Sequence, residues 1–334
     1  MSALLPTSAH QPTAEFLARE LVEVERIFEA QLASDLPAVN ALCRHVERYR
    51  GKMLRPTLVL LTGLAVRARQ QFEPPVLGRE HRVVAAVVEM IHMATLVHDD
   101  VLDEADVRRQ GATVNRLRGN EMAVMLGDYL ISNSFHLCST LGDPAINLRL
   151  GQTTNTLCEG ELIQLHHREN ASLDEETYFE IVRRKTAVLV GACCRLGATL
   201  SGGSPTVIAA LDAFGTALGI AFQIQDDLLD LAGRADIVGK SLGRDLEKGK
   251  VTLPIIIHLA TADLPARRDA LAAIERRDAP RLLAQMRGSG SIDAAHQRAR
   301  ALVVDAKREL QGLVPSPARD LLEAMAEAVV ERER

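Results

Sequence analysis

The chain has 334 residues, of which 47% are hydrophobic and only 3% aromatic, and it contains no tryptophan. This length and apolar content are enough for a large buried core, and the scarcity of aromatic residues favours helices over strands. The formal net charge of −5 argues against nucleic acid as a general partner. The five cysteines contain no C-x-x-C pair, which excludes a disulfide or zinc framework and indicates a reducing compartment. We therefore expect a cytoplasmic protein.

The N-terminal segment, residues 1–13, contains proline and serine, and we expect it to be loose. It has no Lys or Arg before its short apolar patch, which is unlike a secretory signal. No uncharged apolar run approaches the length of a membrane span, so we expect no transmembrane segment. Apolar residues then recur at helical spacing over 14–29 and 37–49, which predicts two helices.

A basic turn follows at 51–56, with the sequence G-K-M-L-R-P. Pro56 at the first position of a helix would begin the next apolar helix, 57–66. Lys52 and Arg55 would then lie on a loop at the N-terminal end of that helix, where backbone N–H groups favour an anion. An ordinary basic turn gives the same pattern.

The helix expected over 79–103 ends in the acidic sequence D-D-x-x-D, formed by Asp99, Asp100 and Asp103. Asp99 and Asp103 share one helical face, one turn apart, and His92 lies on the same stripe. Carboxylates placed in this way repel each other unless a cation lies between them. Mg²⁺ prefers oxygen ligands and combines one or two carboxylates with substrate phosphates. A solvated helix end would also explain the pattern.

The rest of the chain shows helical patterns and no strand alternation of useful length. A connection is expected at 70–78 and a loop at 111–120. Ser172, followed by Glu175 three residues later, has the spacing of an N-cap box. We expect further helices over 122–141, 145–166, 172–186, 187–200 and 205–231, with amphipathic helices over 253–334 that break at 262–265 and 287–291.

A second D-D-x-x-D, formed by Asp226, Asp227 and Asp230, ends the apolar helix expected over 205–231. If the two acidic helix ends lay side by side, their six carboxylates would require divalent cations, which would in turn bind a polyphosphate. Two sets of cations fit such ligands: Arg108, Lys185 and Lys240 around the metals, and Lys52, Arg55, His92 and Arg109 as a metal-free anion pocket. Two anion sites beside an apolar cavity indicate two diphosphate substrates with hydrocarbon tails.

These residues resemble those of the trans-isoprenyl (polyprenyl) diphosphate synthases, and the octaprenyl-type branch is the nearest likeness. The likeness runs from Val39 to Arg332 and includes I-H-x-A-T-L-x-H-D-D-V-x-D at 91–103. Other matching segments are G-K-x-x-R-P at 51–56, E-G-E at 159–161, K-T at 185–186, F-Q at 222–223, G-K at 239–240 and G-K-x-T-L-P at 249–254. The resemblance implies a single-domain, all-α isoprenoid-synthase bundle around a central apolar cavity, here residues 14–334, and a homodimer.

The resemblance also implies an activity: Mg²⁺-dependent, head-to-tail condensation of isopentenyl diphosphate with an allylic diphosphate through a carbocation. It assigns two of three Mg²⁺ ions to Asp99 and Asp103 and the third to Asp226, with Asp100, Asp227 and Asp230 acting through water and outer contacts. It assigns the allylic diphosphate to Arg108, Lys185 and Lys240. Isopentenyl diphosphate is assigned to Lys52, Arg55, His92 and Arg109, with Phe222 over its hydrocarbon and Lys250 as a further substrate-binding residue. Thr186 and Gln223 would place oxygen dipoles near the carbocation.

Product length should depend on the depth of the cavity below the first acidic sequence. Thr95 lies one turn before Asp99, and the resemblance adds Ala94 to the cavity wall. Both are small where short-chain relatives carry aromatic residues, which predicts a long product. Three positions depart from the family pattern: Arg50 and Arg244, where a glycine and an aspartate are common, and Val251 in place of a proline.

Several alternatives compete with this interpretation. A farnesyl or geranylgeranyl diphosphate synthase would differ only in product length. A terpene cyclase or squalene-synthase-like enzyme shares the fold, but the second anion pocket favours an enzyme with two substrates. An HD-type metal phosphohydrolase would use His98–Asp99, with His166 and His167 as candidate further ligands, yet it leaves the second acidic sequence unexplained. A regulatory subunit would usually have lost one acidic sequence, and this chain keeps both.

Overall fold

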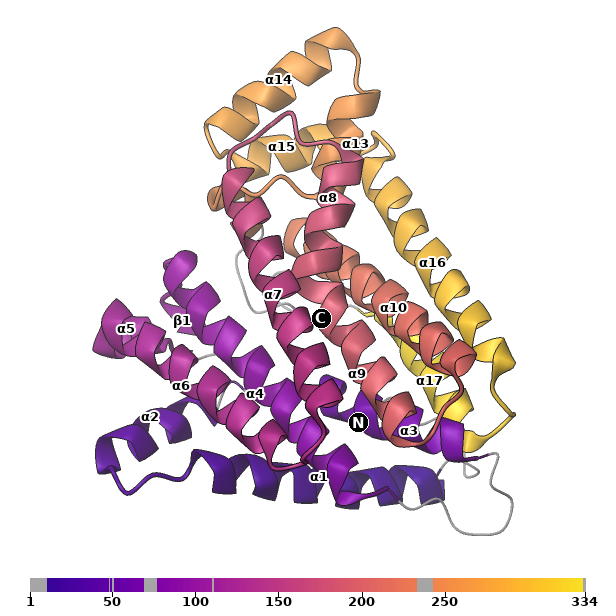
Figure 1. The fold of residues 1–334 in the computed structure, drawn as a ribbon. Helices are drawn as coiled ribbons and strands as arrows, with labels where there is room; N and C mark the ends of the chain where they lie inside the picture. The colour runs from indigo at the N-terminus through magenta and orange to yellow at the C-terminus, as the bar shows by residue number, and fades with distance from the viewer. Residues whose placement is uncertain are drawn as a thin grey trace. The chain divides into compact units, whose positions relative to one another are not determined.

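A computed structural model describes residues 11–47, 49, 51–68, 77–109, 111–232 and 243–332. These residues are almost entirely helical, which confirms the predicted all-α class (Figure 1). The one small sheet in this part of the chain is an antiparallel hairpin of β1 (Val107–Arg108) and β2 (Gly111–Ala112).

The helices of the first half of the chain are α1 (Gln11–Leu32), α2 (Pro37–Glu47), α3 (Leu54–Arg67), α4 (Arg79–Leu102), α5 (Val114–Arg118), α6 (Asn120–Ser139) and α7 (Pro144–His166). Those of the second half are α8 (Glu175–Val182), the π-helical turn η3 (Arg183–Ala187), α9 (Val188–Leu200), α10 (Pro205–Ala232), α12 (Arg244–Glu247), α13 (Leu253–Thr261), α14 (Leu264–Glu275), α15 (Ala279–Met286), α16 (Ser291–Glu309), the 3₁₀ turn η4 (Leu310–Gly312) and α17 (Pro317–Val330).

The chain groups into two compact units, each built from segments that are distant in sequence. The first unit comprises 1–154, 192–212 and 312–322, and the second comprises 155–191, 213–311 and 323–334. The first unit contains the first acidic sequence, and the second unit contains the second.

Helix α4 is the central helix of the first unit and packs against α1, α3 and α6 (Figure 1). Its segment 83–88, V-V-A-A-V-V, is fully buried, because a helix that is apolar all round must be enclosed by its neighbours. The polar side chains of α4 lie in its first turn and from Glu89 onward, so the packed apolar middle holds Asp99, Asp100 and Asp103 at the end of a fixed helix.

The core of the second unit forms around α13, which packs against α8, α14 and α16. Its sequence L-P-I-I-I-H-L begins with a proline in the first turn, where the missing N–H needs no partner. Leu253 and Ile255 of α13 are fully buried beside Ile224 and Leu228 of α10. This core fixes the C-terminal end of α10, where the second acidic sequence lies.

Three predicted helix starts were wrong. Helix α1 begins at Gln11, inside the segment expected to be loose. Helix α3 begins at Leu54, so Arg55 belongs to its first turn and not to a loop. Asp174, not Ser172, caps α8, because the Asp174 carboxylate accepts the Thr177 N–H at 2.8 Å. The Ser172 N–H instead donates to the side chain of Asn170, which holds the chain in a turn before the helix.

The loop predicted at 111–120 was also wrong. It contains β2 and the short helix α5, whose N-cap is Thr113, and α6 already begins at Asn120. Thr113 donates to the Ala105 carbonyl at 2.6 Å, which draws this segment back against the end of α4. A side-chain bond to a carbonyl eight residues earlier has no signal in the local sequence pattern.

Among the described residues one helix, Pro205–Leu231, is long and apolar enough to cross a membrane by length and composition, with a mean hydropathy of 1.7. The core helix of a soluble protein meets the same criteria. This helix buries Leu211, Phe214 and Ile224 completely, and it carries Asp212 near its start and Asp226, Asp227 and Asp230 near its end.

Candidate active site

The first acidic sequence has one buried and two partly exposed carboxylates. Asp100 is only 1% exposed, and Arg108 donates to its Oδ1 from Nε at 2.9 Å and from a terminal nitrogen at 2.8 Å. Arg108 reaches Asp100 because the chain turns back after α4. The turn begins at Glu104, which has a positive φ of 48°, and continues into the β1–β2 hairpin. Asp100 is therefore buried and paired with Arg108, whereas Asp99 and Asp103 are partly exposed.

Tyr49 lies beside this buried ion pair. The Arg108 guanidinium carbon is 5.9 Å from the centre of the Tyr49 ring, and the Tyr49 hydroxyl accepts the Val114 N–H at 3.1 Å. Burial, followed by the charge of Asp100, raises the pKa of Tyr49 to about 12. Asp100, Arg108 and Tyr49 thus form one polar group beneath the end of α4.

Arg55, Arg108 and Arg109 lie near His92 and form with it the His92 cluster, and the predicted role of Lys52, Arg55, His92 and Arg109 as a metal-free anion pocket stays a prediction. Burial lowers the pKa of His92 well below its usual value, and the nearby charges of Arg55, Arg108 and Arg109 lower it further. The pKa of Arg109 is also lowered by burial and by Arg108 and Arg55. Guanidinium groups near a neutral imidazole produce a positive field, which an anion would stabilise, and the Asp100 carboxylate offsets the charge of Arg108.

Gly51 and Glu89 both favour the position of Arg109 in this cluster, and the Arg109 backbone is strained there. A Cβ on Gly51 would overlap the Arg109 guanidinium, so the glycine lets the basic turn approach it closely. Arg109 itself has a positive φ of 47°, a costly conformation for a non-glycine residue. The buried carboxylate of Glu89 partly offsets the repulsion, since its charge raises the pKa of Arg109. Lys52 follows Gly51 and is exposed.

The second acidic sequence repeats the arrangement of the first, because its middle aspartate is again the buried one. Asp227 is 4% exposed and accepts from the Tyr178 hydroxyl at 2.6 Å and from Gln223 Nε2 at 2.9 Å. Burial, followed by the charge of Asp245, raises its pKa well above the usual value. In both sequences the middle aspartate is held by other side chains.

The two outer aspartates of the second sequence have different partners. Asp226 forms an ion pair with Arg332 at 3.1 Å. Asp230 accepts the backbone N–H groups of Arg244 and Asp245 at 3.2 and 3.0 Å and so anchors the start of α12. Burial and the charge of Asp245 raise the pKa of Asp230 to about 6. Asp230 thus has a structural partner in addition to any role toward a metal.

Lys185 and Thr186 lie in η3, the π-helical turn between α8 and α9. Turns of this type are rare and frequently occur at functional sites. A Cβ on Gly160 of α7 would overlap the backbone at Lys185, and a Cβ on Gly219 of α10 would overlap Ala187. The two glycines therefore let α7 and α10 approach the turn closely from their respective sides.

The sequence E-G-E at 159–161 is explained by this turn. Glu159 forms an ion pair with Arg184, Glu161 forms one with Lys185, and Gly160 between them gives the backbone room. Thr186 Oγ1 donates to Gln223 Oε1 at 3.0 Å. Lys185 and Thr186 of η3 thus lie beside Gln223 in the second unit.

The donor set fits Mg²⁺. Among the described residues no three His, Cys, Asp or Glu side chains form a ready-made metal cage. Mg²⁺ does not need one, because it is usually held by one or two carboxylates, water and substrate phosphates. The partly exposed carboxylates of Asp99 and Asp103, one helical turn apart, and of Asp226 supply oxygen donors of that kind.

The remaining predicted site residues have the following positions. Ala94 is fully buried in α4, and Thr95 is partly exposed, with its hydroxyl donating to the His92 carbonyl at 2.8 Å. Phe222 lies under the Arg332 guanidinium, 4.3 Å from the ring centre to the guanidinium carbon. The backbone N–H of Lys250 donates to the Asp245 carbonyl at 2.8 Å. Lys240 and Arg50 lie outside the described residues.

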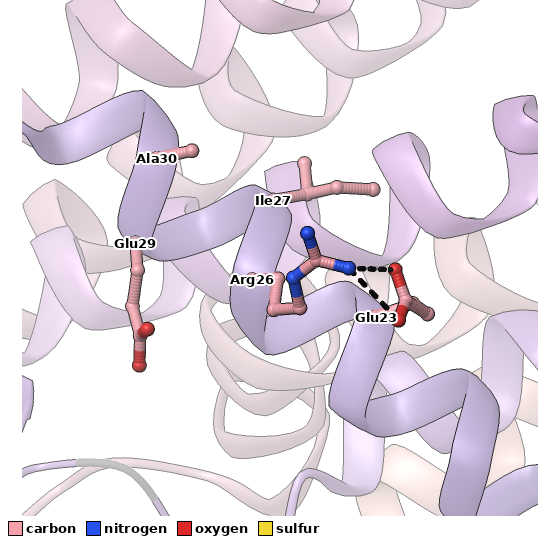
Figure 2. Close-up of a pocket in the computed structure, with 5 residues that line it drawn as sticks. All are labelled: Glu23, Arg26, Ile27, Glu29 and Ala30. Carbon is pink, nitrogen blue, oxygen red and sulfur yellow. Dashed lines mark hydrogen bonds and ion pairs between the residues drawn. The ribbon is translucent and has the colours of Figure 1, made fainter.

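A pocket on α1 contains none of the predicted site residues (Figure 2). Its lining comes from one helix, and its only ionic contact drawn in the view joins Arg26 to Glu23 at 3.0 and 3.1 Å. The pair links residues three apart on an exposed helix face, an arrangement of small energetic weight. We assign no chemistry to this pocket.

Comparison with known proteins identifies the family. Residues 37–285 match the model of the polyprenyl synthetase family. The chain belongs to the polyprenyl synthetase family. It is 34% identical to the octaprenyl diphosphate synthase of Escherichia coli over 325 residues, which cover 96% of this chain and 98% of the relative.

Solved structures agree. A decaprenyl diphosphate synthase from Rhodobacter capsulatus superimposes with a TM-score of 0.89 at 34% identity, covering 97% of this chain and 99% of the other. A polyprenyl synthase from Caulobacter crescentus, solved with calcium and isoprenyl diphosphate, gives a TM-score of 0.89 at 29% identity and covers 98% of this chain and 100% of the other. The predicted isoprenoid-synthase fold is confirmed, and the chain is a trans-prenyltransferase.

Sequence reasoning missed the residues that hold the site together. Tyr49, Tyr178 and Glu89 were not among the predicted site residues. Arg332 was noted only as the end of the resemblance. For Glu161 a signal was present, since E-G-E is more polar than a core stripe, but its partner Lys185 could not be predicted.

Proposed function

We propose that this trans-prenyltransferase condenses isopentenyl diphosphate head-to-tail with an allylic diphosphate and extends it to a long, all-trans polyprenyl diphosphate of about octaprenyl length. One observation carries the two-substrate part of this proposal. The His92 cluster places Arg55 and Arg109 near a neutral histidine in the first unit, in addition to Arg108, which is assigned to the metal-bound diphosphate.

The His92 cluster is assigned to isopentenyl diphosphate. Arg55 and Arg109 would donate to its phosphate oxygens in the paired geometry that guanidinium groups favour. Lys52 lies on the exposed turn beside Gly51 and would add a mobile charge. His92 is neutral at pH 7 without substrate because its pKa is lowered, and an incoming dianion would raise that pKa and favour a second donated proton.

The two acidic sequences are assigned to the allylic diphosphate. Asp99, Asp103 and Asp226 would hold Mg²⁺, three ions in all, and the buried Asp100 and Asp227 would keep the helix ends in place. Bound Mg²⁺ would supply neutralisation of the diphosphate leaving group. Arg108, Lys185 and Lys240 would bind the same diphosphate, with Lys185 held by Glu161 until substrate arrives.

The allylic C–O bond would break as the diphosphate departs, and the isopentenyl double bond would attack the carbocation. Thr186 and Gln223 would direct oxygen dipoles toward this cation. Phe222 would cover the isopentenyl hydrocarbon, and apolar side chains would exclude water, which would otherwise quench the cation. The released diphosphate would accept the proton that is lost.

The product is proposed to be long because Ala94 and Thr95 are small. A homodimer in the cytoplasm is the assembly and location that we propose. Free thiols of Cys43, Cys138 and Cys193 are compatible with a reducing compartment.

Direct binding tests the two-pocket assignment. In the presence of EDTA, isothermal titration should detect isopentenyl diphosphate binding, whereas farnesyl diphosphate should require added Mg²⁺ for its full affinity. Arg109→Gln should weaken the binding of isopentenyl diphosphate and leave the binding of farnesyl diphosphate unchanged. Metal dependence of equal size for both ligands would overturn the assignment of a metal-free pocket.

A further inference from the structure

Tyr178 is a buried polar residue to which the mechanism gives no role. It comes from α8, is 4% exposed, and packs edge-on to Phe179 with ring centres 5.6 Å apart. Its hydroxyl donates to Asp227 Oδ2 at 2.6 Å, a short charge-assisted bond across to α10. A phenylalanine would fill the same space without the cost of burying a hydroxyl, so the hydroxyl itself requires an explanation.

The hydrogen bond of Tyr178 is the first of a connected series. Gln223 Nε2 donates to the other oxygen of Asp227 at 2.9 Å. Thr186 Oγ1 then donates to Gln223 Oε1 at 3.0 Å. All four residues lie in the second unit, and the series connects a core tyrosine to the π-helical turn η3.

The series has a fixed direction. Both oxygens of Asp227 accept, Oδ2 from Tyr178 and Oδ1 from Gln223, so the amide of Gln223 turns its NH₂ group toward Asp227 and its oxygen toward Thr186. The Thr186 proton is then used in the bond to Gln223. The remaining lone pairs of the Thr186 oxygen point away from Gln223, and a hydroxyl fixed in this way offers negative charge density rather than a proton.

We propose that Tyr178 is a positioning residue that acts through Asp227 and Gln223 to fix the Thr186 hydroxyl with its lone pairs toward the allylic carbocation. This inference rests on the proposed function, because it gives Thr186 the cation-facing role assigned there. Tyr178 itself touches neither substrate. Without its hydroxyl, Asp227 Oδ2 loses a donor, the carboxylate can rotate, and the Gln223 amide is no longer fixed.

The test is a double-mutant cycle of Tyr178→Phe and Thr186→Val. Turnover would be followed with labelled isopentenyl diphosphate, farnesyl diphosphate and Mg²⁺. We expect Tyr178→Phe to lower kcat about tenfold, with the KM of each substrate changed less than about twofold, because orientation at the cation matters only in the transition state. We expect the double variant to be no slower than Thr186→Val alone, since residues that act in one series are not additive.

The matched control is Tyr129→Phe. Tyr129 is the tyrosine on α6 in the first unit, and it has no part in the site. It should leave kcat and both KM values unchanged. A wild-type kcat in Tyr178→Phe, or losses that multiply in the double variant, would overturn the inference. An inactive wild-type protein would instead refute the proposed function, so the two failures are distinguishable.

Circular dichroism and thermal unfolding would establish that each variant folds. If Tyr178→Phe did not fold because it leaves a buried carboxylate short of a donor, the uncharged Asp227→Asn background would replace it. Turnover of Asp227→Asn/Tyr178→Phe equal to that of Asp227→Asn would support a role through Asp227. A further loss in the double variant would overturn it.

Discussion

The guanidinium of Arg332 lies 3.1 Å from the carboxylate of Asp226 and 4.3 Å from the centre of the Phe222 ring. The Arg332 carbonyl also accepts from Gln225 Nε2 at 3.0 Å. These contacts anchor the C-terminal segment after α17 on the turn of α10 that begins the second acidic sequence. Arg332 thus balances the charge of Asp226 in the protein without metal.

A metal ion and Arg332 should therefore compete for Asp226. The pair is partly exposed, and such ion pairs contribute at most about 1 kcal/mol. We expect Arg332→Gln to bind Mn²⁺ roughly two- to fivefold more tightly than wild type, as about 1.4 kcal/mol corresponds to tenfold. Electron paramagnetic resonance of free Mn²⁺, titrated without substrate, would measure this. Lys307→Gln, which breaks an ion pair with Glu327 in the same unit, should change nothing. Unchanged or weaker binding in Arg332→Gln would show that Arg332 does not compete.

Gly160 should be essential for the geometry of η3. An alanine there would place its Cβ against the backbone of Lys185 and Arg184, which cannot move without displacing the turn. We expect Gly160→Ala to lower kcat/KM for the allylic substrate by a factor of ten or more, about 1.4 kcal/mol of transition-state stabilisation.

Gly151→Ala is the matched control for this prediction, because it lies on the same helix α7 and its Cβ would meet no described atom within 4 Å. It should keep full activity and gain up to about 1 kcal/mol of stability from helix propensity. Equal activity of the two variants would contradict the role assigned to the close contact at η3.

His81 should make the stability of the protein depend on pH. It is 1% exposed in α4, and its Nε2 lies 2.9 Å from Ser201 Oγ. Burial lowers its pKa to about 4, so the folded protein holds it neutral while the unfolded chain takes up a proton below about pH 6.5. The contribution of His81 to stability is therefore complete above about pH 6.5 and is lost as the pH falls toward 4.

Urea unfolding at pH 7.5 and pH 5, without metal or substrate, would measure this effect. The free energy of unfolding of wild type should fall between these values by about 2 kcal/mol more than that of His81→Gln. Exchanging the exposed His136 for glutamine should leave the wild-type dependence intact. An identical pH dependence in wild type and His81→Gln would refute the assignment.

Some of the site could be predicted from the sequence because its signals are local. The spacing of Asp99 and Asp103, and the repeat at Asp226, place carboxylates at helix ends whatever the rest of the fold does. The π-helical turn could not be predicted, because R-R-K-T-A has no local preference for it and the fit against Gly160 and Gly219 depends on distant segments.

The partners of the site residues could not be predicted from the sequence for the same reason. Tyr178 has the apolar spacing of a core residue, and only the fold brings its hydroxyl to Asp227. The error at Ser172 has a different origin. Ser172 and Asp174 are both good caps, and the turn held by Asn170 decides which of them begins the helix.

Product length should respond to bulk at Ala94 and Thr95. Thr95→Phe should shorten the product, since Thr95 is partly exposed and an aromatic ring can be accommodated there. Ala94→Phe should also shorten it, but at a stability cost of about 1–3 kcal/mol, because Ala94 is fully buried among packed helices. Chromatography of dephosphorylated products would show the distribution. Val22→Phe, at a position 54% exposed on α1, is the control. An unchanged product distribution in both test variants would show that Ala94 and Thr95 do not line the cavity.

The most direct measurement is the mass of the product made by the purified protein. The protein would be incubated with Mg²⁺, labelled isopentenyl diphosphate and farnesyl diphosphate, and the polyprenols analysed after dephosphorylation. We expect one dominant long product, close to eight isoprene units, whose label content equals the number of units added. No incorporation of isopentenyl diphosphate, or a cyclised product formed from farnesyl diphosphate alone, would contradict the proposal of a two-substrate elongating enzyme.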